Sequence, residues 1–104
     1  MTDEPKPAEL TQARADQIRI GAAIRRSQLT AIDRQVMWTV NDLAAAAADA
    51  GESFAISIEE LSEQTGLPAD VIGRRVSGLV QIGWIARTGN GPWLPTVPEP
   101  RSAP

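Results

Sequence analysis

The sequence predicts a mainly α-helical domain with one small β-hairpin, which places it in the α+β class. Between residues 9 and 82, four segments have the apolar spacing or the start and stop signals of helices. Residues 84–87 then alternate as a strand does, and a Gly- and Asn-rich turn separates them from a second short apolar run.

The first predicted helix covers residues 9–28. Its apolar stripe includes Leu10, Ile20 and Ile24, and Gly21 weakens the helix by roughly 1 kcal/mol relative to Ala. On one interpretation the stripe packs on the domain or on a second copy of the chain, and Arg25 and Arg26 meet phosphate. On the other, the two arginines are only the solvated face of a helix that closes the core.

The second predicted helix runs from Ala31 to about Asp49. Thr30 is placed to cap it with Asp33 three residues on, and Gly51 is placed to stop it. Its predicted buried residues are Ile32, Val36, Met37, Val40, Leu43 and Ala47. The small residues 44–48 would let a neighbouring helix come close, including one from a second copy. Trp38 is either a core residue or an interface anchor.

Residues 57–83 predict two short helices joined by a tight turn. Ser57 and Glu60 have the spacing of a capping box at the start of the first helix. Gly66 can take the left-handed conformation that ends a helix, and Pro68 suits the first turn of the next one. The second of these helices should run from about Pro68 to Ile82 and stop at Gly83.

That helix has two different faces. Its apolar face carries Ile72, Val76, Leu79 and Val80, with Ala69 beneath them, and its opposite face carries Asp70, Gly73, Arg74, Ser77, Gly78 and Gln81. A helix with short outward side chains can lie closely in a DNA major groove. The alternative is an ordinary surface helix whose small residues are merely solvated.

The hairpin follows directly. Residues 84–87 and 93–94 are its predicted strands, residues 88–92 its turn, and Pro95 and Pro98 keep the return strand short. Residues 54–56 are short and apolar, which suits a small strand pairing with this hairpin.

These residues resemble a bacterial winged helix-turn-helix domain of the MarR-like type, and are also similar to the N-terminal winged helix of phage replication proteins. The matching motifs are Ile58-x-x-Leu61, Thr65-Gly66-Leu67, Val76-x-x-Leu79 and Gly83-x-Ile85, and the similarity covers roughly residues 30 to 97. The resemblance implies that the groove-facing positions are Ala69, Asp70, Gly73, Arg74 and Ser77, and that Arg87 and Asn90 are the wing contacts. The chain departs from the usual pattern, because such positions are often Ser, Thr, Arg or Lys.

Composition argues against catalysis. The chain has neither Cys nor His, which excludes Cys/His zinc sites, thiol chemistry and histidine bases. Glu59, Glu60 and Glu63 form an acidic cluster, but they are better interpreted as a solvated face. No nucleotide-binding motif is present, and no cofactor and no metal are expected.

The net charge of −3 disfavours nucleic acid mildly, but positive charge gathers locally. Residues 10–36 hold five arginines against only Asp16 and Asp33. Residues 1–8 and 98–104, rich in proline, are expected to be disordered tails around one domain at 9–97. The sequence predicts neither a signal peptide nor a membrane-spanning segment, so we expect a cytoplasmic protein.

Double-stranded DNA is therefore the expected partner, with transcriptional regulation as the function and a phage or mobile element as the expected source. A protein-interaction adaptor and a phage replication or recombination accessory factor are the alternatives. The predicted contacts to DNA are the groove and wing residues above, with Arg25 and Arg26.

Overall fold

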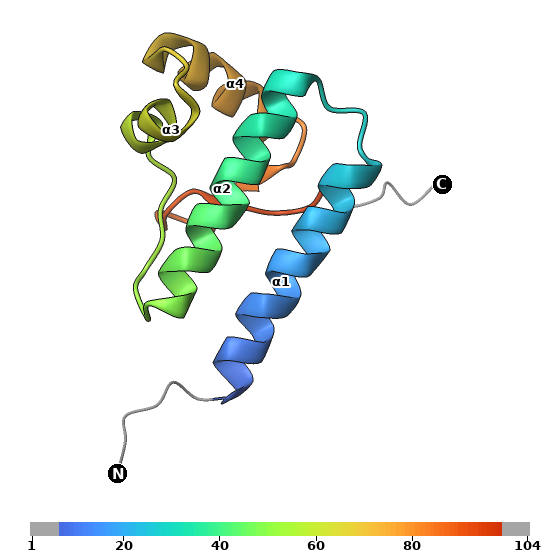
Figure 1. Cartoon of the computed structure of the whole chain (residues 1–104), viewed down its shortest axis with the longest axis vertical. Helices are drawn as coiled ribbons and strands as arrows, with labels where there is room; N and C mark the ends of the chain where they lie inside the picture. Colours follow the sequence, from blue (N-terminus) through green and yellow to red (C-terminus); the bar gives the residue numbers. More distant parts are fainter. Residues whose placement is uncertain (1–6, 99–104) are drawn as a thin grey trace.

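The computed structural model describes residues 7–98, with side chains from residue 14 onward, and has four helices followed by a two-stranded antiparallel sheet (Figure 1). The helices are α1 (Pro7–Arg26), α2 (Ala31–Asp49), α3 (Ile58–Thr65) and α4 (Ala69–Gln81). The strands are β1 (Ile85–Ala86) and β2 (Leu94–Pro95), with Ile85 opposite Pro95 and Ala86 opposite Leu94. The expected class, mainly α with a small hairpin, is confirmed.

The helix boundaries follow from local capping. The Thr30 hydroxyl accepts a hydrogen bond from the backbone N–H of Asp33 at 3.3 Å, as the sequence predicts for the start of α2. Gly51 has a φ of 70° just beyond the end of this helix. α1 begins at residue 7 and ends at residue 26, each two residues before the predicted bound.

The core is built around α2. Val36, Met37 and Val40 are fully buried on one stripe of this helix, which contacts α1, α3, α4 and β2. The other buried apolar residues are Ile20, Ile24, Leu61, Ile72, Leu79, Trp84 and Ile85. The sequence also places Ile32, Leu43 and Ala47 in this core, but all three are only partly buried.

α1 and α2 run antiparallel, side by side (Figure 1). Two contacts set their spacing. The buried Asn41 amide donates from Nδ2 to the carbonyl of Gln17 at 3.2 Å. Trp38 lies so close to Gly21 that a Cβ at this glycine would stand 3.3 Å from the indole ring. The glycine that weakens α1 therefore admits the Trp38 ring, which packs on α1.

The extended segment before α3 differs from the sequence prediction. Residues 54–56 form no strand; instead one backbone hydrogen bond, from Ile56 N–H to the Trp93 carbonyl at 3.1 Å, links them to the hairpin. Proline at position 95 can donate no ladder hydrogen bond, which limits further pairing here. Apart from residues 7, 8 and 98, the tails expected at 1–8 and 98–104 lie outside the described residues.

Two helical glycines make a matched pair for a stability test. We expect Gly78→Ala to raise the free energy of unfolding by about 1 kcal/mol, because a Cβ there meets nothing within 4 Å and Ala is the better helix former. Gly21→Ala should not raise the free energy of unfolding, because the added Cβ would press on the Trp38 ring. Urea unfolding of both variants measures the difference, and equal gains would contradict the close approach at Gly21.

Candidate nucleic-acid interface

The turn between α3 and α4 is held by side chains as well as by backbone. Gly66 has a φ of 76°, and its N–H donates to the carbonyl of Ser62 at 2.9 Å. The Ser62 hydroxyl donates to the carbonyl of Leu67 at 2.6 Å. The Thr65 hydroxyl donates to the carbonyl of Leu61 at 2.7 Å and accepts from Leu67 N–H at 3.2 Å. These bonds fix the direction in which α4 leaves the turn.

The start of α3 matches the sequence prediction, and α4 begins at Ala69, one residue after the predicted start at Pro68. The Ser57 hydroxyl accepts from Glu60 N–H at 3.3 Å, which is the N-cap half of the predicted capping box. Pro68 occupies the N-cap position of α4, and its carbonyl accepts from Ile72 N–H at 3.0 Å. Leu67, an apolar residue within the turn, packs against the core.

The two faces of α4 separate as the sequence predicts, except that Ala69, which helical periodicity placed beneath the apolar face, is exposed. Ile72 and Leu79 are fully buried, while Val76 and Val80 are partly buried. The exposed residues are Ala69, Asp70, Arg74, Ser77, Gly78 and Gln81, and Gly73 is half-buried at their edge. We call these seven residues the outer face of α4. It is mostly small and polar, so its backbone can be approached closely.

Arg74 and Asp70 are paired on this face. The Arg74 Nη2 atom lies 3.2 Å from Asp70 Oδ2, and Arg74 Nε donates to the Asp70 carbonyl at 3.4 Å. Both side chains remain about three-quarters exposed, at 76% and 73%. An exposed pair of this kind contributes only about 0–1 kcal/mol, so Arg74 can leave it for another partner. The sequence carries the signal, an acid and an arginine four residues apart on a helix.

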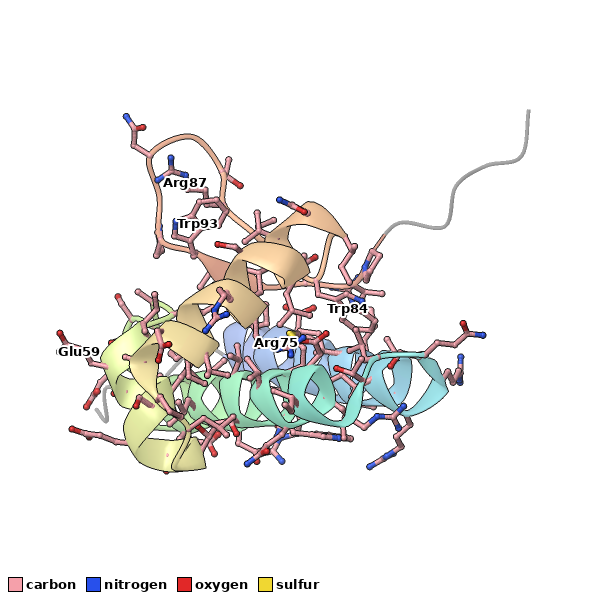
Figure 2. The ribbon with its side chains drawn as sticks, turned by 90° about the horizontal axis from the view of Figure 1, so that it is seen from above. Glu59, Arg75, Trp84, Arg87 and Trp93 are labelled. Atoms are coloured by element: carbon pink, nitrogen blue, oxygen red, sulfur yellow. The ribbon has the colours of Figure 1, made fainter. Side chains whose placement is uncertain are left out.

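The hairpin loop, residues 87–93, projects away from the helices (Figure 2). Within it the Arg87 guanidinium lies over the Trp93 ring, 4.7 Å from the ring centroid. Asn90 is exposed in the same loop, and Gly91 N–H donates to the Thr88 carbonyl at 3.0 Å. The Arg87–Trp93 contact was not predicted, because it depends on the geometry of the loop.

Arg25 and Arg26 do not join this surface. They are exposed at the end of α1, and α2 lies between α1 and the α3–α4 pair (Figure 1). The Arg25 guanidinium instead lies 5.4 Å from the centroid of the Trp38 ring on α2. The structure therefore brings together Ala69, Asp70, Gly73, Arg74 and Ser77 on one helix, places Arg87 and Asn90 on the hairpin, and leaves Arg25 and Arg26 apart.

The charge around α4 is nearly balanced. Between residues 57 and 98, the carboxylates are Glu59, Glu60, Glu63 and Asp70, and the guanidiniums are Arg74, Arg75 and Arg87. The three glutamates are exposed on α3, and Glu59 lies well away from Arg87 (Figure 2). Any attraction for phosphate must therefore come from individual arginines, because the surface as a whole carries no positive excess.

The chain matches no protein-family model, no curated protein sequence and no solved structure. Over residues 7–98, no helix is long and apolar enough to cross a membrane. In the same part of the chain no cluster of three or more His, Cys, Asp or Glu side chains could hold a metal ion.

The left-handed turn residue can be tested directly. We expect Gly66→Ala to lower the free energy of unfolding by about 1–2 kcal/mol, because a Cβ is strained at this φ. Gly66→Asn should cost less, because Asn tolerates the left-handed region better. Chemical denaturation of both variants is the measurement, and a neutral Gly66→Ala would show that the turn adopts another conformation.

Proposed function

We propose that this protein binds double-stranded DNA through the outer face of α4 and regulates transcription. The observation that carries the proposal is this face itself: an exposed helical surface of small and polar side chains around Arg74, aimed by a rigid turn. A major groove admits a helix of this kind, and Arg is the side chain best suited to hydrogen-bond guanine.

The order of the elements supports a winged helix-turn-helix. α2, the extended residues 54–56, α3, α4 and the hairpin follow one another as the parts of that fold do, with α1 added in front. The bond from Ile56 to Trp93 ties the extended segment to the hairpin at the place where the fold has its short first strand. On this reading α4 is the recognition helix and the hairpin is the wing.

Gly78 adds a second argument. A glycine inside a helix costs roughly 1 kcal/mol relative to Ala, and nothing within 4 Å of this position would obstruct a Cβ. Packing within the chain therefore gives no reason for a glycine there. A glycine is explained if an external partner approaches the α4 backbone closely at this position. The sugar-phosphate backbone of DNA would be such a partner.

Each residue then has a role. Arg74 leaves Asp70 to contact a base edge or a phosphate, and Ser77 and Gly73 set the distance of the helix from the groove. Arg87 and Asn90 contact the DNA backbone from the hairpin. We also propose a source in a phage or mobile element and a cytoplasmic location.

The proposal is tested by titrating a mixed-sequence DNA duplex at two salt concentrations with matched arginine variants. Arg74→Ala should weaken binding by about 1–3 kcal/mol if Arg74 contacts a base. Arg14→Ala is the control, because Arg14 is also exposed and paired, with Asp49 at 3.7 Å, but lies on α1. Equal losses in both variants, or no binding at low salt, would contradict the assignment.

Substitution of Asp70 should have the opposite effect to substitution of Arg74 and strengthen DNA binding. Removing its charge by Asp70→Asn frees Arg74 and takes a carboxylate off the surface that faces phosphate. Affinity for mixed-sequence DNA should rise several-fold at low salt and converge with that of the unchanged protein as salt screens the difference. A fall in this non-specific affinity would mean that the Asp70–Arg74 pair is itself needed for binding.

A protein-interaction adaptor is the second candidate. The near-neutral charge around α4 favours it, as does the exposure of large apolar side chains beside this helix, Ile58 at 41% and Trp93 at 37%. Failure to bind DNA at low salt, with the fold intact, would favour this function over the first.

A further inference from the structure

Basic side chains gather where α1 ends and α2 begins. Arg25 and Arg26 are exposed in the last turn of α1. Arg34 joins them at this end of the helix pair, because its Nη2 atom donates to the Ser27 carbonyl at 3.0 Å. Asp33 is the one carboxylate in this stretch of the chain, and its Oδ1 atom is buried. The three arginines therefore give this end a positive excess, which the surface around α4 lacks.

Trp38 adds an apolar part to this surface. The Arg25 guanidinium lies over the Trp38 ring, 5.4 Å from its centroid, and the ring is only partly buried where it packs on α1. Trp and Arg are the side chains that most often dominate the energy of protein–protein contacts. We call Arg25, Arg26, Arg34 and Trp38 the basic corner. Carboxylates next to an apolar side chain complement it better than duplex phosphates do, because phosphates have no apolar group to place on the ring.

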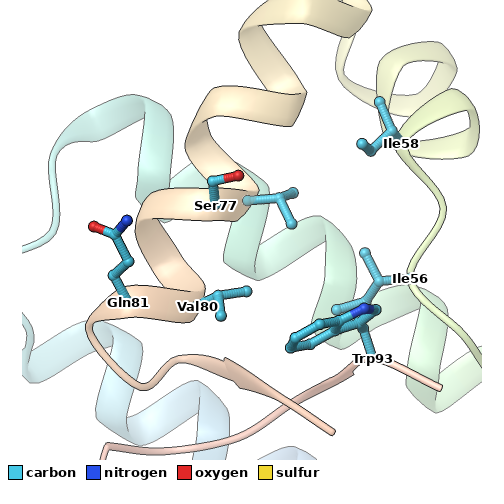
Figure 3. Close-up of a pocket in the computed structure, with 7 residues that line it drawn as sticks. Ile56, Ile58, Ser77, Val80, Gln81 and Trp93 are labelled. Carbon is cyan, nitrogen blue, oxygen red and sulfur yellow. The ribbon is translucent and has the colours of Figure 1, made fainter. Parts of the chain in front are cut away.

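The complement to the basic corner lies on α3, which carries three glutamates and no basic residue. Glu59 and Glu63 are exposed, and because they are one turn apart they lie on the same side of the helix. Glu59 lies at the outer edge of the molecule (Figure 2). Ile58, the residue before it, is 41% exposed and supplies the apolar side chain (Figure 3). We call Ile58, Glu59 and Glu63 the acidic face of α3.

Neither surface meets its complement within one copy of the chain. No ion pair joins Arg25, Arg26, Glu59 or Glu63 to any side chain between residues 14 and 98. The end of α1 and the helix α3 lie on opposite flanks of the molecule, with α2 between them (Figure 1). One copy cannot bring the two surfaces together, whereas neighbouring copies can.

We propose that the acidic face of α3 of one copy docks on the basic corner of the next, so that copies associate head to tail. The two glutamates pair with Arg25 and Arg26, and Ile58 packs against the Trp38 ring. Because the two surfaces differ, each added copy offers a free one, and the row continues instead of closing as a two-fold dimer. None of these residues belongs to the outer face of α4, which stays open.

On DNA, such a row would place neighbouring copies side by side. That consequence rests on the proposed function, whereas the contact between copies does not, so the contact is tested without DNA. Exposed ion pairs each contribute little, so free copies associate weakly, and salt should weaken the contact further.

The first test is sedimentation equilibrium of the full chain at low and at high salt. At low salt the average mass should rise continuously with protein concentration, and at high salt the rise should be lost. A mass that stays at one copy would overturn the proposal. A mass that levels off at two copies would overturn it as well, since a two-fold contact pairs each surface with itself.

Charge reversal then locates the contact. Arg25→Glu/Arg26→Glu and Glu59→Lys/Glu63→Lys should each associate roughly tenfold more weakly than the unchanged protein, because like charges then face one another. An equimolar mixture of the two variants should associate again, because the new lysines meet the new glutamates. A mixture that does not associate would overturn the proposal.

A matched control separates position from net charge. Arg14→Glu/Arg19→Glu makes the same change in charge on the same helix, but these arginines lie outside the basic corner and are paired with Asp49 and Asp16. This control should associate as the unchanged protein does, and an equal loss in both α1 variants would overturn the assignment.

A milder variant covers the case in which Arg25→Glu/Arg26→Glu fails to fold. Arg26→Glu alone leaves Arg25 on the Trp38 ring and takes the place of the double variant in the mixture. The same restoration of association is expected, and its absence would overturn the proposal.

Discussion

The rest of the structure depends on the burial of one stripe of α2. Val36, Met37 and Val40 have no exposed surface, and α1, α3, α4 and β2 all contact the helix that carries them. In a domain this small few other residues can supply a core, so loss of any of these contacts would loosen several elements together. The orientation of α4 is thus set twice, by the apolar contacts of Ile72 and Leu79 inside and by the hydrogen-bonded turn at Gly66.

The fixed orientation of α4 matters because the outer face of this helix has little net charge with which to attract a partner. Arg74 is balanced by Asp70, and the glutamates of α3 offset the remaining arginines. Any affinity for DNA must then come from fit: small side chains, a close backbone approach at Gly78, and one arginine that exchanges a weak surface ion pair for a contact to DNA.

Local signals predicted most of the fold. Thr30, Ser57 and Gly66 cap or end helices within four residues of themselves, so their spacing was enough to place α2, α3 and α4. The prediction of a strand at residues 54–56 was wrong. Strand pairing there depends on the hairpin, which is distant in sequence and forms only one backbone hydrogen bond with this segment. The outer face of α4 followed from helical periodicity, but the separation of Arg25 and Arg26 from it depends on the antiparallel packing of α1 on α2. The apolar groove between α4, residues 56–58 and the hairpin could not be predicted, since separate segments of the sequence form it.

The most direct test of the central claim is a backbone NMR titration of the protein with a short mixed-sequence DNA duplex at low salt. The account predicts that the shifted amide signals cluster in residues 69–81 and 87–93, and that those of residues 14–26 on α1 remain in place. Shifts centred on α1, or on α3 with α4 unaffected, would contradict it, and would assign DNA binding to a different surface of the molecule.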